Sequence, residues 1–238
     1  MEKRELLFDG NEKQVFATSD PQLVIFRFKD VVTAYNNVKR AHVQRKGKVN
    51  NAISSLLFEY LKEHGVDTHF VRRIDDREQL CRKIEIIPIE LIVRNVVAGT
   101  EAMRLGMPEG TRPSTPIFNL RYNNDGLGDP IINDTEAVAL GIATPDDLKV
   151  ILRTGKCINK LLAALFEKAG ITLVDLKLEF GRAHDGSIIV SDEISPDTAR
   201  FWDAATGERL DKDRFRLDLG DVVASYEKVY DRLKAVVK

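Results

Sequence analysis

Residues 173–181 read Leu-Val-Asp-Leu-Lys-Leu-Glu-Phe-Gly, and polar and apolar side chains alternate along the stretch. Alternation of this kind predicts a β-strand, because successive side chains of a strand point to opposite faces. Asp175, Lys177 and Glu179 should therefore share one face, and the apolar residues should share the other. An ordinary solvent-facing strand has the same pattern, so the neighbouring segments decide whether this face is functional.

A hairpin is predicted directly after this strand. Asp185-Gly186 is typical of a two-residue turn, and a second strand should follow within residues 187–194. Such a turn would place Glu179 directly opposite Asp192. Two carboxylates at one point repel each other unless a cation neutralises them, which favours a Mg²⁺ site. A turn longer by one residue would instead send Asp192 to the opposite face.

A candidate anion site follows residue 94. Thr100 is the predicted N-cap of a short helix over residues 101–105, which Gly106 closes. The first turn of a helix offers free N–H groups to anions, and the guanidinium of Arg94 suits bidentate phosphate binding. A capped surface helix beside a solvated arginine is the equally good alternative.

Further cations accompany these segments. Lys13 follows Gly10 just before a predicted strand, an arrangement that can cover nucleotide phosphates, although a simple glycine turn explains it as well. Lys177 and Arg200 are candidates for holding anionic groups beside the metal.

The rest of the chain mixes strands and helices without regular alternation, which favours the α+β class. Strands are predicted at residues 14–17 and 23–28, a strand pair or one bent strand at 85–97, a long irregular loop at 112–130, and helices at 50–64, 75–83, 145–168 and 222–237. We place a domain boundary near Pro88, giving domains 1–88 and 89–238.

Composition excludes several classes of protein. The 36 Lys and Arg against 37 Asp and Glu give a net charge of −1, which argues against general nucleic-acid binding. No apolar stretch reaches the about 20 residues that a membrane span needs. Cys81 and Cys157 lie in predicted helices without partners at metal spacing, so two buried thiols in a reducing cytoplasm are expected. The histidines share no ligand spacing either.

Taken together, these segments resemble the SAICAR synthetase family of purine biosynthesis nearly end to end. The most specific matches are Val174–Gly181 and Asp192–Asp197, followed by Arg200 and Trp202-Asp203. Further matches are Ile86–Pro88, Val93–Asn95 with Ala98-Gly99, Lys46-Gly47, Asn50-Asn51 and Asp211–Arg216. The resemblance implies an α+β fold with a small nucleotide-covering domain and a larger catalytic domain, related to ATP-grasp and kinase-like proteins. It also implies a homodimer.

The reaction that the resemblance implies is an ATP-dependent ligation in the cytoplasm. L-aspartate would be joined to carboxyaminoimidazole ribonucleotide (CAIR) through an acyl phosphate, with ATP and Mg²⁺ as cofactors. Neither nucleic acid nor a membrane would take part.

Site residues are carried over position by position. The resemblance implies an ATP site in which Gly10 and Lys13 contact the phosphates. Val15 with Leu23 or Val24 would line the adenine pocket, and Glu85, Ile86 and Ile87 would form its hinge. By the same resemblance, Glu179 and Asp192 would bind Mg²⁺. Arg94, Thr100 and Arg200 would bind the ribonucleotide phosphate, and Lys177 and Asp175 would act near the reacting carboxylate. The chain departs from the family at Asn11 and Asn123, where lysine is usual, at Asn37, where glycine is usual, and at Thr100, where serine is usual.

Two other functions stay open at this stage. A kinase-like phosphotransferase would use the same Mg²⁺–ATP apparatus on a hydroxyl group and would need no ribonucleotide-phosphate site at Arg94 and Thr100. A nucleotide-binding module would bind ATP without catalysing a reaction.

Overall fold

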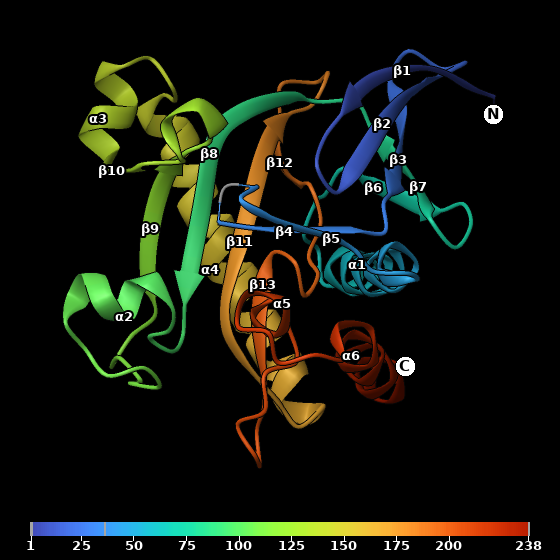
Figure 1. Cartoon of the computed structure of the whole chain (residues 1–238). Helices are drawn as coiled ribbons and strands as arrows, with labels where there is room; N and C mark the ends of the chain where they lie inside the picture. The colour runs from blue at the N-terminus through green and yellow to red at the C-terminus, as the bar shows by residue number, and fades with distance from the viewer. Residues whose placement is uncertain (1, 36, 238) are drawn as a thin grey trace.

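The computed structural model describes residues 2–35 and 37–237, and two antiparallel sheets organise that part of the chain (Figure 1). The first sheet has the order β1-β2-β3-β7-β6, formed by Lys3–Asp9, Lys13–Thr18, Leu23–Phe28, Glu78–Arg82 and Phe70–Arg73. Its strands β2 and β3 confirm the two strands predicted at residues 14–17 and 23–28. A separate hairpin, β4 (Val31–Ala34) with β5 (Lys39–His42), passes in front of the second sheet in Figure 1.

The second sheet contains the alternating stretch of residues 173–181. Its order is β10-β9-β8-β11-β12, with β13 also paired to β11; the strands are Ile131–Ile132, Ile117–Tyr122, Glu85–Arg94, Ile171–Arg182, Ile188–Ser191 and Ala199–Asp203. The helices are α1 (Lys46–Glu63), α2 (Thr100–Leu105), α3 (Asp134–Ala139), α4 (Pro145–Lys168), α5 (Asp213–Arg216) and α6 (Val222–Val236). Helices and antiparallel strands that do not alternate regularly confirm the α+β class.

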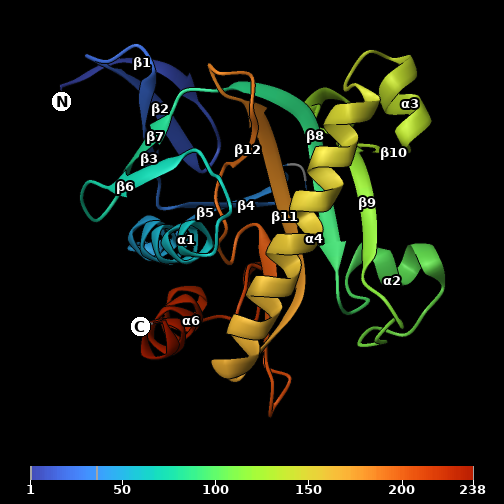
Figure 2. The ribbon, with the colours of Figure 1, turned by 180° about the vertical axis from the view of Figure 1, so that it is seen from behind.

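Helix α4 covers the back of the second sheet (Figure 2). Thr144 and Asp147 form a capping box at its start, and its last residue is Lys168, so the helix predicted at 145–168 is confirmed. Its apolar stripe packs on β8 and β11. Gly155 permits the close approach, because a Cβ there would lie 2.2 Å from Leu91 Cδ2. With one face covered, the opposite face of β8 and β11 is left for polar side chains.

Helix α1 packs against β3, β6 and β7 of the first sheet and lies beside α6 (Figure 1), and it begins four residues before the predicted start. Its first turn is held by Asp30, whose carboxylate accepts hydrogen bonds from the backbone N–H groups of Arg45 (3.1 Å) and Gly47 (2.9 Å). Arg77 donates to the same carboxylate at 2.9 and 2.6 Å. Burial acts to raise the pKa of Asp30, but these donors outweigh it and lower the pKa to about 2. A partner distant in sequence thus sets the start of the helix.

Three sequence predictions about residues 75–83, residues 112–130 and the two cysteines are wrong. Residues 75–83 contain a turn and the strand β7 rather than a helix, because Asp75 closes the turn by accepting from the backbone N–H groups of Arg77 and Glu78. The predicted loop at 112–130 contains the strand β9, which pairs with β8 along its whole length. Cys81 is buried in β7, whereas Cys157 is exposed on α4, so the second thiol is not a core residue.

Pro88 lies inside one continuous, bent strand. β8 pairs with β11 from Glu85 to Arg94, and the register shifts between Glu90 and Ile87, beside the proline. The bent-strand alternative for residues 85–97 is therefore the observed one. The chain passes from the first sheet to the second between Arg82 and Glu85. The division into domains at residue 88 stays a prediction.

Within the described residues, no helix combines the length and the apolar character that crossing a membrane requires.

Candidate active site

Strand β11 presents the predicted polar face. Lys177 Nζ lies 2.6 Å from Glu90 Oε1 on β8 and 2.5 Å from Glu179 Oε1. Asp175, on the same face, lies 2.7 Å from Arg94. The polar residues of the alternating stretch therefore share the face away from α4 and form two sets of ion pairs there.

The hairpin register differs from the prediction by one residue. Glu179 pairs with Ser191 rather than with Asp192, because the turn holds three residues, His184, Asp185 and Gly186. The longer turn has a physical reason, since only Gly186 in it adopts a positive φ, of 84°, whereas a two-residue type I′ turn needs two such residues.

Asp192 nevertheless faces the same cluster. It lies just beyond β12 and adopts a left-handed backbone conformation with a φ of 64°. The turn of the chain there brings its carboxylate to Lys13 Nζ, which also lies 2.9 Å from Glu193 Oε1. The charges of the two predicted metal ligands act on each other because of the left-handed backbone at Asp192, and not through cross-strand pairing.

The electrostatics of this pair show mutual repulsion held in check by lysines. Burial and the charge of Asp192 raise the pKa of Glu179, against the effect of Lys177. Burial acts to raise the pKa of Asp192 as well, but Lys13 and Lys177 outweigh it and lower the pKa. Both carboxylates are buried, and both depend on the charge of Lys177. Carboxylate oxygens are the hard donors that Mg²⁺ prefers. Glu179 and Asp192 therefore fit a divalent cation.

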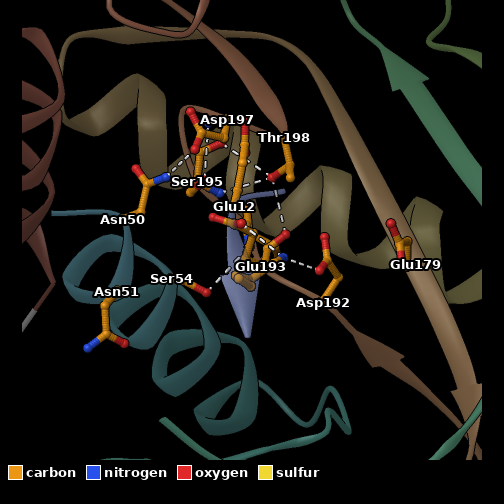
Figure 3. A network of polar contacts seen from close by, with 12 residues as sticks. Glu12, Asn50, Asn51, Ser54, Glu179, Asp192, Glu193, Ser195, Asp197 and Thr198 are labelled. Carbon is orange, nitrogen blue, oxygen red and sulfur yellow. Dashed lines mark hydrogen bonds and ion pairs between the residues drawn. The ribbon is translucent and has the colours of Figure 1, made fainter. Parts of the chain in front are cut away.

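A second acidic cluster was missed by sequence reasoning. Glu12, Glu193 and Asp197 gather between α1 and the segment after β12, whereas Glu179 stands apart on β11 (Figure 3). Lys46 neutralises two of them: it forms a buried ion pair with Asp197 and lies 3.7 Å from Glu12. Each of these residues belongs to a sequence motif described above, around Gly10, Lys46 or Asp192–Asp197. The spacing within each motif did not show that the three segments meet in space.

An arginine pair encloses Asp175. Its carboxylate lies 2.7 Å from Arg94 and 2.8 Å from Arg200, and Arg200 also lies 2.8 Å from Asp213. Arg94 lies 3.7 Å from Glu101 as well. The two predicted phosphate-binding arginines are therefore brought together, and Asp175 is the residue that holds them there.

Thr100 does not have its predicted capping role. The N-cap of α2 is Gly99, and Thr100 is the exposed first residue of a helix of six residues. Gly99 has a φ of 59°, and a Cβ there would lie 2.6 Å from the Arg200 guanidinium. A glycine is required there, so Gly99 takes the cap position that was predicted for Thr100. Gly106 does close the helix, in a left-handed conformation.

The residues predicted for the nucleotide lie along the first sheet and the start of β8. Gly10 donates its N–H to Lys13 O at 2.9 Å, which closes a tight turn and directs the Lys13 side chain to Asp192 and Glu193. The register places Val15 of β2 and Val24 of β3 on one face of the sheet. Glu85 and Ile86 are exposed at the beginning of β8.

Comparison with known proteins agrees with this geometry. The profile of the SAICAR synthetase family matches residues 6–233. A phosphoribosylaminoimidazole-succinocarboxamide synthase of Clostridium beijerinckii is 52% identical over 98% of this chain and 99% of its own length. The enzyme of that name from Fusobacterium nucleatum is 51% identical over 98% of both chains.

Solved structures agree as well. The crystal structure of phosphoribosylaminoimidazole-succinocarboxamide synthase from Ehrlichia chaffeensis has a TM-score of 0.95 and 43% identity, over 98% of this chain and 100% of its own. A SAICAR synthetase in complex with ADP has a TM-score of 0.94 and 41% identity, over 98% and 99% of the two chains. Together with a cluster of lysines, arginines and carboxylates on one sheet face, these matches show that the chain belongs to the SAICAR synthetase family.

Proposed function

We propose that the protein is an ATP-dependent carbon–nitrogen ligase that joins L-aspartate to CAIR in purine biosynthesis, giving SAICAR, ADP and phosphate. One observation supports this most directly. Three sets of ion pairs lie on or beside one sheet face: Lys13 with Asp192, Lys177 with Glu179, and Arg94 and Arg200 with Asp175. Together these charges can neutralise a nucleotide, a metal and a second phosphate. The names of the similar enzymes point to the same reaction.

The nucleotide belongs on the side of the first sheet. A family relative with 41% identity has been solved with ADP, which supports nucleotide binding here. Lys13 would contact the phosphates beside the Gly10 turn, Val15 and Val24 would line the adenine pocket, and Glu85 and Ile86 would form its hinge.

Glu179 and Asp192 would hold Mg²⁺, which when bound supplies charge neutralisation between the nucleotide phosphates. Catalysis of phosphoryl transfer depends chiefly on positioning and on such neutralisation. Lys13 already lies between Asp192 and Glu193 and can turn from these carboxylates toward a phosphate.

The ribonucleotide substrate, CAIR, would bind at the arginine pair Arg94 and Arg200. Arg94 and Arg200, with Thr100 at the rim, would bind the ribonucleotide phosphate, and Lys177 with Asp175 would lie near the reacting carboxylate. An oxygen of that carboxylate attacks the γ-phosphorus and ADP leaves. The amine of aspartate then attacks the acyl carbon, phosphate leaves with the bridging oxygen, and the nitrogen loses a proton. Lys177 is placed to stabilise the oxygen charges in both steps.

The proposal also covers the domains, the assembly and the location of the protein. We place the two domains at 1–88 and 89–238, with the nucleotide between them, and propose a cytoplasmic homodimer that acts on small molecules alone.

A coupled assay of ADP release tests the reaction. ADP should form only when ATP, L-aspartate, CAIR and Mg²⁺ are all present, and one amide product should form for each ADP. A kinase-like phosphotransferase would release ADP without aspartate. A nucleotide-binding module would bind ADP in calorimetry and release none from ATP, and either result would overturn the proposal.

Replacing Arg94 with glutamine should raise the KM for CAIR about 10- to 100-fold, because a charge-assisted hydrogen bond to phosphate is lost. ADP affinity, measured by calorimetry, should stay within about twofold, because Asp175 keeps Arg200 as its partner. Arg104→Gln is the matched control, since Arg104 also binds Glu101 but its side chain is 45% exposed. Equal losses of CAIR and ADP affinity would contradict the placement of the ribonucleotide.

A further inference from the structure

Arg121 on β9 is a further cation of the polar face. It pairs in register with Glu90 on β8, and Glu90 pairs with Glu179 on β11. The side chains of residues paired in this way point to the same face of a sheet. Arg121 therefore stands on the face that carries Lys177, two strands from Glu179.

The charge of Arg121 has no partner among the side chains that the structure describes. Lys13, Lys177, Arg94 and Arg200 each form at least one ion pair with a carboxylate. Arg121 forms none, and its Nε atom is buried without a hydrogen-bond partner. Its charge is felt, without an ion pair, by two neighbours: it adds to the burial that lowers the pKa of Arg94, and it helps Arg104 and Arg94 to lower the pKa of Glu101.

A second unsatisfied atom lies on the same strand and the same face. Asn119 is two residues before Arg121, and its Oδ1 atom is buried without a hydrogen-bond partner. Asn119 pairs with Ile92, which pairs with Lys177. A buried donor and a buried acceptor without partners both cost free energy unless a ligand satisfies them. The two atoms together suit a ligand that carries a negative group and a hydrogen-bond donor.

We propose that Arg121 binds a carboxylate of L-aspartate and that Asn119 accepts a hydrogen bond from its amine. The inference rests on the proposed function, which requires a site for aspartate beside the metal and the ribonucleotide. The phosphate dianion is matched by Arg94 and Arg200, whereas a single carboxylate is matched by one guanidinium. Strands lie about 4.8 Å apart, so Arg121 is about 10 Å from Glu179 across the sheet, a separation that aspartate and the acyl group can bridge.

Kinetics of the Arg121→Gln enzyme test this placement. The KM for aspartate should rise about 10- to 100-fold, with the KM values for CAIR and ATP within about threefold of the parent. The inhibition constant of succinate, which has both carboxylates but no amine, should rise by a similar factor. Asn119→Ala should raise the KM for aspartate and leave inhibition by succinate unchanged, because succinate makes no contact through an amine.

Arg153→Gln is the control, because Arg153 is exposed on α4, behind the sheet. All of its kinetic constants should equal those of the parent. If Arg121→Gln does not fold, Arg121→Lys keeps the charge but loses the planar fork, and its KM for aspartate should still rise about threefold or more. A KM that rises for CAIR instead, or an unchanged KM for aspartate, would refute the inference. A parent enzyme that turns over without aspartate would refute the proposed function instead.

Discussion

Asp192→Asn should lower kcat about 100- to 1,000-fold, with a smaller effect on the KM for CAIR, because a charge that stabilises phosphoryl transfer is removed. Asparagine has nearly the same shape and tolerates the left-handed backbone of this position, where φ is 64°. The substitution therefore removes the charge and leaves the backbone in place. Steady-state kinetics at saturating ATP and CAIR measure the effect.

Magnesium dependence gives a second readout of the same variant. The parent should bind ADP more tightly when Mg²⁺ is present, and Asp192→Asn should lose most of that increase in calorimetry. Asp146→Asn serves as control, because Asp146 is an exposed carboxylate at the start of α4 with 88% of its side chain accessible. If kcat of Asp192→Asn stays within tenfold of the parent and ADP binding keeps its response to Mg²⁺, Asp192 is not a metal ligand.

Lys46→Met should lower the free energy of unfolding by about 3–5 kcal/mol, which is the cost of removing one partner from a buried ion pair. Lys46 is 1% exposed, and it pairs with Asp197, whose side chain is fully buried. Burial acts to raise the pKa of Asp197, but Lys46 and Lys212 outweigh it and keep the carboxyl ionised. Without Lys46, the carboxylate retains two neutral donors, Tyr226 Oη at 2.8 Å and Asn50 Nδ2 at 2.5 Å, and the charge of Lys212, which forms no ion pair with it. Urea unfolding monitored by circular dichroism measures the change.

The same helix offers a matched control for this variant. Lys48 pairs with Asp76, but the two side chains are 45% and 66% exposed, so Lys48→Met should change the free energy of unfolding by no more than about 1 kcal/mol. Should Lys46→Met prove too unstable to purify, adding Asp197→Asn should restore part of the loss, since the unpaired charge is then gone. Equal stabilities of the Lys46 and Lys48 variants would show that the buried pair does not hold α1 to the site.

Local patterns predicted the elements that depend on neighbouring residues. The alternation in 173–181 is the strand β11, and the cap at Thr144 begins a helix that ends at Lys168, as predicted. Residues 75–83 were predicted wrongly, because acidic residues that resemble the first turn of a helix instead close the turn before β7. The strand β9 was missed because most of its hydrogen bonds go to β8, which precedes it by more than twenty residues.

The sequence predicted which residue types form the site, but not how they are arranged in space. Residue types on β11 indicated a cation site, yet the three-residue turn shifts Glu179 from Asp192 to Ser191, and only the backbone conformation of Asp192 returns its carboxylate to the cluster. Lys46 was noticed as part of a motif, but its pairing with Asp197 spans 151 residues.

The sequence by itself determined which charges this protein carries to its site and on which strand face most of them stand, because alternation and capping act within a few residues. Only the tertiary structure decided which of those charges neutralise one another. It pairs Arg94 and Arg200 with Asp175, and Lys13 with Asp192, and it leaves Arg121 without a carboxylate among the described residues. The physical reason is that an ion pair needs proximity in space, and strand register and chain turns set that proximity between segments far apart in the sequence.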